Sequence, residues 1–173
     1  LSGTGVLKAF EYSGPWLQIK RAGSLLHSNS LYLEQSSCEV PRTIECELRG
    51  TNLIHPTAQV HPSACIGPNF TLEVNFHVGN GAGIANSLLY DGVQVADHAY
   101  VSRSIMGRNS AIGPWARLEG ILNTSPKEYD GEHRRGATIL GEGAGVGPEV
   151  MLFNTIVMPH KRISRSQKNK IIM

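Results

Sequence analysis

Histidine is the residue type in this sequence with the widest chemistry, because a neutral imidazole can bind zinc or act as a general base. Seven histidines occur, and His55 and His61 stand six residues apart in "IHPTAQVHPSAC". Side-chain direction alternates along a strand, so we expect both imidazoles to point outward, on different faces of the molecule. Two imidazoles in that arrangement do not share a metal ion. We therefore predict surface histidines, no metal site and no catalytic residue.

The C-terminal segment 159–173, "PHKRISRSQKNKIIM", is the most basic part of the chain. No acidic residue follows Glu149, whereas five cations do, namely Lys161, Arg162, Arg165, Lys168 and Lys170. A structural explanation is a short C-terminal helix that caps the open end of a repetitive domain. The functional alternative is a surface for a partner or for phosphate groups. We expect the cap, although the two roles are compatible.

Segment 121–137, "ILNTSPKEYDGEHRRGA", is polar and rich in charge. A loop of about 17 residues is long for a compact fold, and such loops are usually functional or disordered. Ordering it costs entropy, which contacts with another protein would offset. We therefore predict a partner-contact loop, with a merely solvated loop as the alternative. The candidate contact residues are Lys127, Glu128, Asp130, Glu132, Arg134 and Arg135.

The overall composition excludes several classes of protein. Sixteen basic and fourteen acidic residues give a net charge of +2, which is no reason to expect nucleic acid binding. No apolar run approaches the length of a membrane helix. Cys38, Cys46 and Cys65 form neither a CxxC pair nor a zinc pattern, which favours a reduced, cytoplasmic protein. The first residues lack an initiator Met and a signal-peptide pattern, so we expect the C-terminal part of a longer protein.

A six-residue repeat must position these segments. Aliphatic residues recur at every sixth position from residue 54 to residue 84, and the pattern returns before and after segment 121–137. The positions expected to face inward are Ile54, Val60, Ile66, Leu72, Val78, Ile84, Ile112, Leu118, Leu140 and Val146. Small or turn-forming residues, such as Ala58 and Pro62, lie between them.

This repeat is typical of a parallel β-helix with triangular coils. Each six-residue unit is one strand and one corner, and three units make a coil of about 18 residues that pairs with its neighbours as parallel strands. We predict an all-β, left-handed β-helix over residues 52–158, interrupted by loop 121–137 and followed by the cap at 159–173.

The segment "SGPWLQIKRAGSLLHSNSLYL", residues 13–33, precedes the repeat and does not share it. Trp16, Leu17 and Ile19 form an extended apolar run, and a helix-like spacing follows through Leu25 and Leu26. We predict that residues 1–35 hold the last strand and helix of an α/β domain, joined to the β-helix by a linker at 36–51.

Four stretches together resemble one family: "WLQIKRAGSLLHSNSLYL", "IHPTA", "IGPWARLEG" and "NTIVMPHKRISRSQKNKIIM". They are similar to the GDP-mannose pyrophosphorylases (mannose-1-phosphate guanylyltransferases), and within them to the alpha-type regulatory subunit. The resemblance implies an upstream nucleotidyltransferase-like domain, through which GDP-mannose could bind. It also implies a homo- or hetero-oligomer with the catalytic beta-type subunit as partner.

The resemblance gives Gln18 a meaning. Catalytic sugar nucleotidyltransferases typically have Trp-x-Asp-[Ile/Thr]-Gly at this place, and the aspartate helps to hold magnesium. In this sequence the matching positions, from Trp16 to Lys20, read W-L-Q-I-K. A neutral amide is a poor Mg²⁺ ligand, so the resemblance implies a degenerate metal position at Gln18. Mg²⁺ is then expected only for a catalytic partner, and no cofactor for this chain. A tolerated structural change is the alternative.

Two functions follow from the resemblance. The first is the C-terminal β-helix part of a regulatory, assembly-forming subunit of GDP-mannose biosynthesis; the second is the C-terminal domain of a catalytic guanylyltransferase. An independent hexapeptide acyltransferase ranks third, because "WLQIKRAGS" would then have no role. In each of the first two cases we expect residues 1–173 alone to lack a nucleotide site and catalytic activity.

Overall fold

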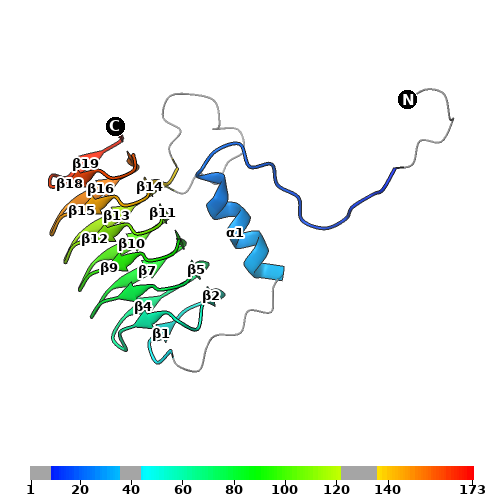
Figure 1. Ribbon diagram of the computed structural model, residues 1–173. Helices are drawn as coiled ribbons and strands as arrows, with labels where there is room; N and C mark the ends of the chain where they lie inside the picture. The colour runs from blue at the N-terminus through cyan, green and yellow to red at the C-terminus, as the bar shows by residue number, and fades with distance from the viewer. Residues whose placement is uncertain (1–8, 36–43, 122–135) are drawn as a thin grey trace.

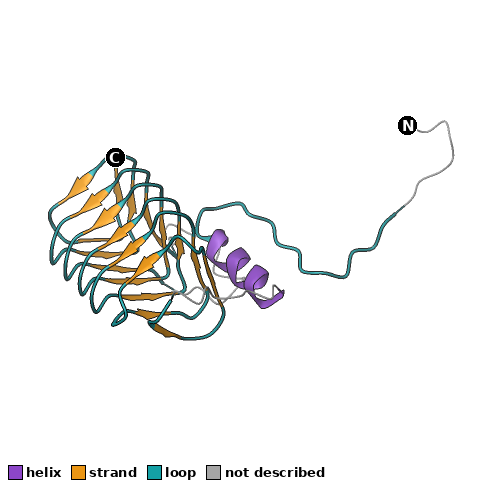
Figure 2. Ribbon diagram, turned by 60° about the horizontal axis from the view of Figure 1, so that its bottom comes forward, coloured by secondary structure: helices purple, strands orange, loops and turns teal. Residues whose placement is uncertain are grey.

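The computed structural model describes residues 9–35, 44–121 and 136–173. Within these residues the chain forms one helix, α1 (Ser24–Gln35), and a series of short parallel strands. The strands wind into a three-sided coil whose sides are three parallel sheets, with α1 outside it (Figures 1 and 2). This is the parallel β-helix that the hexapeptide repeat predicts.

Each coil contributes one strand to each side. The first sheet contains β1 (Glu47–Leu48), β4 (Cys65–Ile66), β7 (Gly83–Ala85), β10 (Tyr100–Ser102), β13 (Arg117–Glu119), β16 (Met151–Phe153) and β19 (Gln167–Lys168). The second contains β2 (Asn52–Ile54), β5 (Phe70–Leu72), β8 (Leu88–Leu89), β11 (Ser104–Met106), β14 (Thr138–Leu140), β17 (Ile156–Val157) and β20 (Ile171–Ile172). The third contains β3 (Gln59–Val60), β6 (His77–Val78), β9 (Gln94–Val95), β12 (Ala111–Ile112), β15 (Gly145–Val146) and β18 (Arg162–Ile163).

The core is the interior of the coil, and it is built from the aliphatic positions of the repeat. Nine of the ten positions predicted to face inward are at most 5% exposed, and Val60 in the first coil is half-buried and packs against them. Stacked aliphatic side chains remove apolar surface from water on every side, at about 25 cal/mol per Å². The interior therefore provides most of the stability of a domain whose strands are two or three residues long.

The length of a coil changes along the chain. Ile66 pairs with Ile84, 18 residues further on, whereas Ile84 pairs with Val101, 17 residues further on. The missing residue comes from a corner, and Leu89 takes the inward position that a strict six-residue repeat would give to Tyr90. A corner tolerates the deletion because the inward side chain still stacks on its neighbours.

Helix α1 lies against the outer face of the second sheet, beside β5 and β8. Leu33 is 1% exposed there, while Leu25 and Leu26 are half-buried. The Thr71 hydroxyl donates a hydrogen bond of 2.7 Å to Oδ1 of Asn29 on the helix. The helix expected within residues 13–33 is thus present, and its apolar side packs on the β-helix.

The strand expected around Trp16 is not formed. Residues 9–20 contain no strand and run away from the β-helix (Figures 1 and 2), and Trp16 is 77% exposed. A strand requires a neighbour with free backbone groups, and among the described residues none lies beside this segment. The apolar pattern alone was therefore insufficient to form it.

Both ends of the β-helix differ from the expectation. It begins within the predicted linker, because β1 pairs with β4, and Ile44 and Cys46 pack against the core. The expected C-terminal helix is wrong, since segment 159–173 forms β18, β19 and β20 instead. Open backbone groups on β15, β16 and β17 offer that segment a template for pairing, and Ile163 is 8% exposed inside the coil.

Candidate functional site

Loop 121–137 leaves the β-helix at the corner between the first and second sheets. A column of buried hydroxyl residues runs along this corner, made of Ser87, Ser104, Thr138 and Thr155. Each hydroxyl donates to a backbone carbonyl near its own corner: Ser104 to Ser102 O at 2.8 Å, and Thr138 to Glu119 O at 2.6 Å. The amide of Thr155 in turn donates to the Thr138 hydroxyl at 3.3 Å. After the loop, Thr138 thus takes the position that pairs with Ser104 of the preceding coil.

Beside the hydroxyls, one corner position has a backbone φ between 48° and 55° in five coils. The residues are Asn69, Asn86, Arg103, Asn154 and Asn169. Asparagine tolerates this left-handed conformation better than other side chains. Its amides also form a ladder between coils, in which Asn154 Nδ2 donates to Asn169 Oδ1 at 2.7 Å. Arg103 is the one residue among these five that is not an asparagine.

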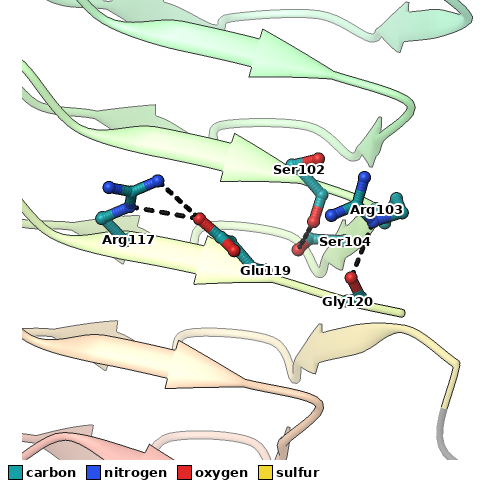
Figure 3. Close-up of polar contacts among 6 residues, drawn as sticks. All are labelled: Ser102, Arg103, Ser104, Arg117, Glu119 and Gly120. Atoms are coloured by element: carbon teal, nitrogen blue, oxygen red, sulfur yellow. Dashed lines mark hydrogen bonds and ion pairs between the residues drawn. The ribbon is translucent and has the colours of Figure 1, made fainter. Parts of the chain in front are cut away.

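Gly120 occupies the same corner position in the coil from which the loop departs. Arg103 Nε donates a hydrogen bond of 2.7 Å to the Gly120 carbonyl (Figure 3). A Cβ added at Gly120 would lie 2.7 Å from Gly136 O and would also collide with Arg103 O. The chain therefore leaves and re-enters the β-helix at nearly one point, where a side chain on residue 120 has no room. We call Arg103, Gly120 and Thr138 the loop root.

Helix α1 reaches the same place. A Cβ added at Gly23, just before the helix, would lie 3.8 Å from the Cβ of Ala137, which directly precedes Thr138. The loop root is thus bordered by the β-helix on one side and by the start of α1 on the other. A contact made by the loop would be positioned by both.

The outer face of the first sheet, next to the loop root, carries paired polar and aromatic side chains. Arg117 forms an ion pair of 2.7 Å with Glu119 (Figure 3), and its guanidinium lies 5.2 Å from the centre of the Tyr100 ring. At the neighbouring corner, Trp115 is 60% exposed and stacks on His98 with ring centres 4.2 Å apart. Exposed Trp, Tyr and Arg side chains are the types enriched at protein interfaces.

A carboxyl pair lies near a second corner. Burial raises the pKa of Glu73, and the hydrogen bond and charge of Asp91 raise it further, while Arg108 lowers it. Arg108 Nε approaches Asp91 at 3.9 Å on the surface. Glu73, Asp91 and Arg108 form a small charged cluster.

The structure shows where several of the expected site residues lie. Gln18 is exposed on the extended segment before α1. His55 and His61 are exposed, as expected, and each ring contacts the hydroxyl two residues further on, at 2.9 Å and 2.8 Å. The loop candidates fall in residues 122–135 and lie outside the described residues: Lys127, Glu128, Asp130, Glu132, Arg134 and Arg135.

Two negative findings concern the described residues alone. In residues 9–35, 44–121 and 136–173, no three His, Cys, Asp or Glu side chains gather closely enough to hold a metal ion. The degenerate metal position expected at Gln18 stays a prediction, and Gln18 itself is exposed. Within the same ranges, no helix has the length and apolar character needed to cross a bilayer.

The cations of the C-terminal segment surround the last coil. Lys161, Arg162, Arg165, Lys168 and Lys170 are all exposed on β18 to β20 and the turns between them. Lys168 lies over the Phe153 ring at 5.2 Å. Charged side chains protect an open sheet edge from pairing with other chains, which is the structural role we expected of a cap. A partner or phosphate surface remains a prediction.

Residues 48–172 match the family model of the GMPPB C-terminal domain, and this match covers almost the whole β-helix. The chain belongs to this family. Curated relatives include the mannose-1-phosphate guanylyltransferase regulatory subunit alpha of Dictyostelium discoideum, which is 41% identical over all of this chain and 42% of its own length. The corresponding proteins of Xenopus tropicalis and Sus scrofa are 36% and 37% identical over all of this chain. The chain spans less than half the length of these family members.

Solved structures agree with the fold. PerB from Caulobacter crescentus, in complex with CoA and GDP-perosamine, superposes with a TM-score of 0.57 over 68% of this chain and 50% of its own. The two sequences are 22% identical, so the likeness concerns the β-helix and carries no activity with it.

The loop root was not predicted from the sequence. Its signal is nevertheless present in the sequence, because a left-handed corner residue precedes a hydroxyl in Asn86-Ser87, Arg103-Ser104 and Asn154-Thr155. Aligning these pairs places Arg103 where two other coils have Asn86 and Asn154. The contact with Gly120 could not be found this way, since it joins residues 17 positions apart.

Proposed function

We propose that this chain is the C-terminal β-helix part of an alpha-type regulatory subunit in GDP-mannose biosynthesis. The observation that carries this proposal is the similarity of the whole chain to relatives named as regulatory subunit alpha, at 36% to 41% identity. The specific stretches "WLQIKRAGS" and "MPHKRISRS" lie within that match. In this role the β-helix builds an assembly and carries no chemistry of its own.

The partner we propose is the catalytic beta-type subunit, which loop 121–137 would contact. The loop root supports this proposal, because hydrogen bonds to the β-helix hold the residues on both sides of the loop, Gly120 and Thr138. The charged residues Lys127, Glu128, Asp130, Arg134 and Arg135 would supply polar contacts with the partner. The exposed Trp115 adds an interface-type side chain on the neighbouring corner.

Loss of catalysis in the parent protein is part of the proposal. Gln18 replaces the acid expected of a magnesium ligand, and it lies on an exposed segment. A regulatory subunit could still bind GDP-mannose through an upstream domain. Cys46 and Cys65 are free thiols, which supports a reducing, cytoplasmic location.

A second candidate is the C-terminal domain of a catalytic guanylyltransferase. It is favoured by the names of two Xenopus laevis relatives, which read "mannose-1-phosphate guanyltransferase alpha-A" and "alpha-B" and do not mention regulation. Turnover distinguishes the candidates, because a catalytic parent forms GDP-mannose without a partner subunit.

The test uses the full-length protein that contains this chain, co-expressed with a beta-type catalytic subunit. The variant lacks residues 123–135, which are replaced by a Gly-Ser bridge. We expect its circular dichroism and melting temperature to match the parent protein, because the inner aliphatic positions are untouched. Co-purification with the catalytic subunit should weaken, or the inhibition of that subunit should be relieved.

Charge-reversed variants refine the result. Arg134→Glu and Arg135→Glu retain the loop length, so a loss of assembly in these variants would identify polar contacts as the cause. Arg49→Glu, on the exposed first coil, is the matched control, since it reverses the charge of an arginine far from the loop root. Unchanged assembly and unchanged partner activity in the deletion variant would contradict the proposed role of the loop.

A further inference from the structure

The last coil of the β-helix lies at one end of the molecule, and its strands have a neighbouring strand on one side only. Among the described residues, β18, β19 and β20 each stand last in their sheet, and this coil is the red end of the ribbon in Figure 1. In that part of the chain, the backbone N–H and C=O groups on the outer edge of each strand have no strand beyond them. Such an edge is a template on which another extended chain can pair.

Five cations surround this edge. All are exposed, namely Lys161, Arg162, Arg165, Lys168 and Lys170. The three ion pairs of the described residues involve other arginines, so no described carboxylate neutralises any of these five cations. Residues 159–173 contain no acid, and their five positive charges exceed the net charge of +2 of the whole chain. The last coil is thus a strongly positive end of a chain that is otherwise net acidic.

The β-helix holds the backbone of these cations in place. The amide of Gly145 donates to Lys161 O at 2.8 Å, and the amide of Asn169, next to Lys168, donates to Phe153 O at 2.9 Å. The ammonium group of Lys168 lies over the Phe153 ring at 5.2 Å. A backbone that is already ordered loses little further entropy when a ligand binds. A ligand would therefore meet positive charges in positions that the coil sets.

The spread of the cations over the coil distinguishes between possible ligands. Ile163 faces inward on β18 and is 8% exposed, so Arg162 beside it points outward from the third sheet. Lys168 points outward from the first sheet, over the ring of its partner in the next strand. A single phosphate group reaches one side of the coil and cannot contact both. An extended chain that follows the coil can contact both, and carboxylates are the side chains that pair with Lys and Arg.

Edge protection is the structural alternative, because charged side chains keep open strand edges from pairing with other chains. The opposite end of the β-helix shows that an edge does not require charge of one sign. There β1, β2 and β3 stand at the ends of their sheets, and the charges are mixed: Glu45 is exposed, and Glu47 forms an ion pair of 2.7 Å with Arg49. Charge of one sign repels a second copy of the same edge and attracts an acidic chain.

We propose that the edge of the last coil is a docking site for an extended acidic segment of another protein. The segment adds strands beside β18 and β19, as a further partial coil would, and its carboxylates face Arg162 and Lys168. Backbone pairing provides the affinity, and the cations select the sign of the charge. The inference is independent of the proposed function, because it uses neither loop 121–137 nor the loop root.

The experiment measures peptide binding to the full-length protein that contains this chain, by calorimetric titration at low salt. The probe is a peptide of about ten residues in which glutamate and threonine alternate, and the control peptide has lysine in place of glutamate. We expect saturable binding of the acidic peptide alone, weakened at least about fivefold in about 0.5 M salt, which screens exposed ion pairs. Methylating alternate backbone nitrogens of the acidic peptide retains its charge but removes its donors, so binding should weaken by about tenfold.

Charge reversal locates the site. Arg162→Glu and Lys168→Glu should each weaken binding of the acidic peptide by about fivefold, because a repulsive pair replaces an attractive one. Both side chains are exposed, so the melting temperatures should stay within about 3 °C of the parent protein. Arg162→Gln removes the charge without reversing it and should have a smaller effect. The matched control is Arg49→Glu, which reverses an exposed arginine at the opposite end of the β-helix and should leave binding unchanged.

Several results would overturn the inference. If the acidic peptide does not bind, the cations only protect the edge, and if neither reversal weakens its binding, the site lies elsewhere. Equal binding of the N-methylated peptide would show that no strand is added. Inorganic phosphate that displaces the peptide and depends equally on Arg162 and Lys168 would identify a phosphate surface instead. Self-association of the full-length protein that Lys168→Glu abolishes would identify a second copy as the occupant.

Discussion

Replacing Ile66 by aspartate tests the register of the whole β-helix. Ile66 is 0% exposed on β4 and is stacked between Leu48 and Ile84 in the inner column of the first sheet. Cys65, its neighbour on the same strand, is half-exposed and points to the outer face. The two positions differ by one residue, and a shift of one residue exchanges the inner and outer faces of a strand.

The expected loss of stability follows from burial. Truncating a buried isoleucine costs about 2–5 kcal/mol, and an unpaired carboxylate in an apolar interior adds several more. The sum is comparable to the whole stability of a typical domain, about 5–15 kcal/mol. Cys65→Asp places the same charge outside, opposite Glu47, where like charges cost at most about 1 kcal/mol.

Circular dichroism and urea unfolding of both variants provide the measurement. We expect Ile66→Asp to be unfolded, or to lose at least about 5 kcal/mol, while Cys65→Asp unfolds within about 1.5 kcal/mol of the parent chain. If Ile66→Asp retained the parental spectrum and midpoint, or if Cys65→Asp were the more damaged variant, the assigned register would be wrong.

Three further predictions concern the loop root, the carboxyl pair and catalysis. Gly120→Ala should lower the melting temperature by several degrees, because the new Cβ would collide with backbone on both sides of the loop, whereas Gly145→Ala, with its nearest neighbour at 3.7 Å, should be neutral. The pKa of Glu73 is raised in the folded state, so its carboxyl contributes stability below its unfolded pKa and loses that contribution as the pH rises through the folded value. Glu73→Gln, which removes this titration beside Asp91, should therefore raise the melting temperature at pH 7, and the gain should vanish near pH 4; a gain that grows on acidification would refute the sign. The full-length parent, with Gln18 at the metal position, should show little guanylyltransferase turnover without a partner, and robust turnover of the purified protein would leave the catalytic alternative.

Along the first sheet, the sequence repeat predicts which side chains face inward but not which outer side chains contact each other. The six-residue spacing predicted that Ile84 and Leu118 face inward, because an inward position depends on neighbours within one strand and one corner. The same pattern does not predict that Trp115 stacks on His98, since that contact joins different coils. The stacking follows from the length of a coil, which single corners decide.

The sequence by itself determined the β-helix, the inward aliphatic positions and helix α1, because each depends on local periodicity. Only the tertiary structure decided that segment 159–173 forms a last coil and that residues 9–20 form no strand. In both places the outcome depended on whether a neighbouring strand offered free backbone groups, and β15 to β17 offered them while no described residue did so for Trp16. The loop root is likewise a feature that only the tertiary structure decided. Arg103 and Gly120 are distant in sequence, and the winding of one complete coil brings them within a hydrogen bond of each other.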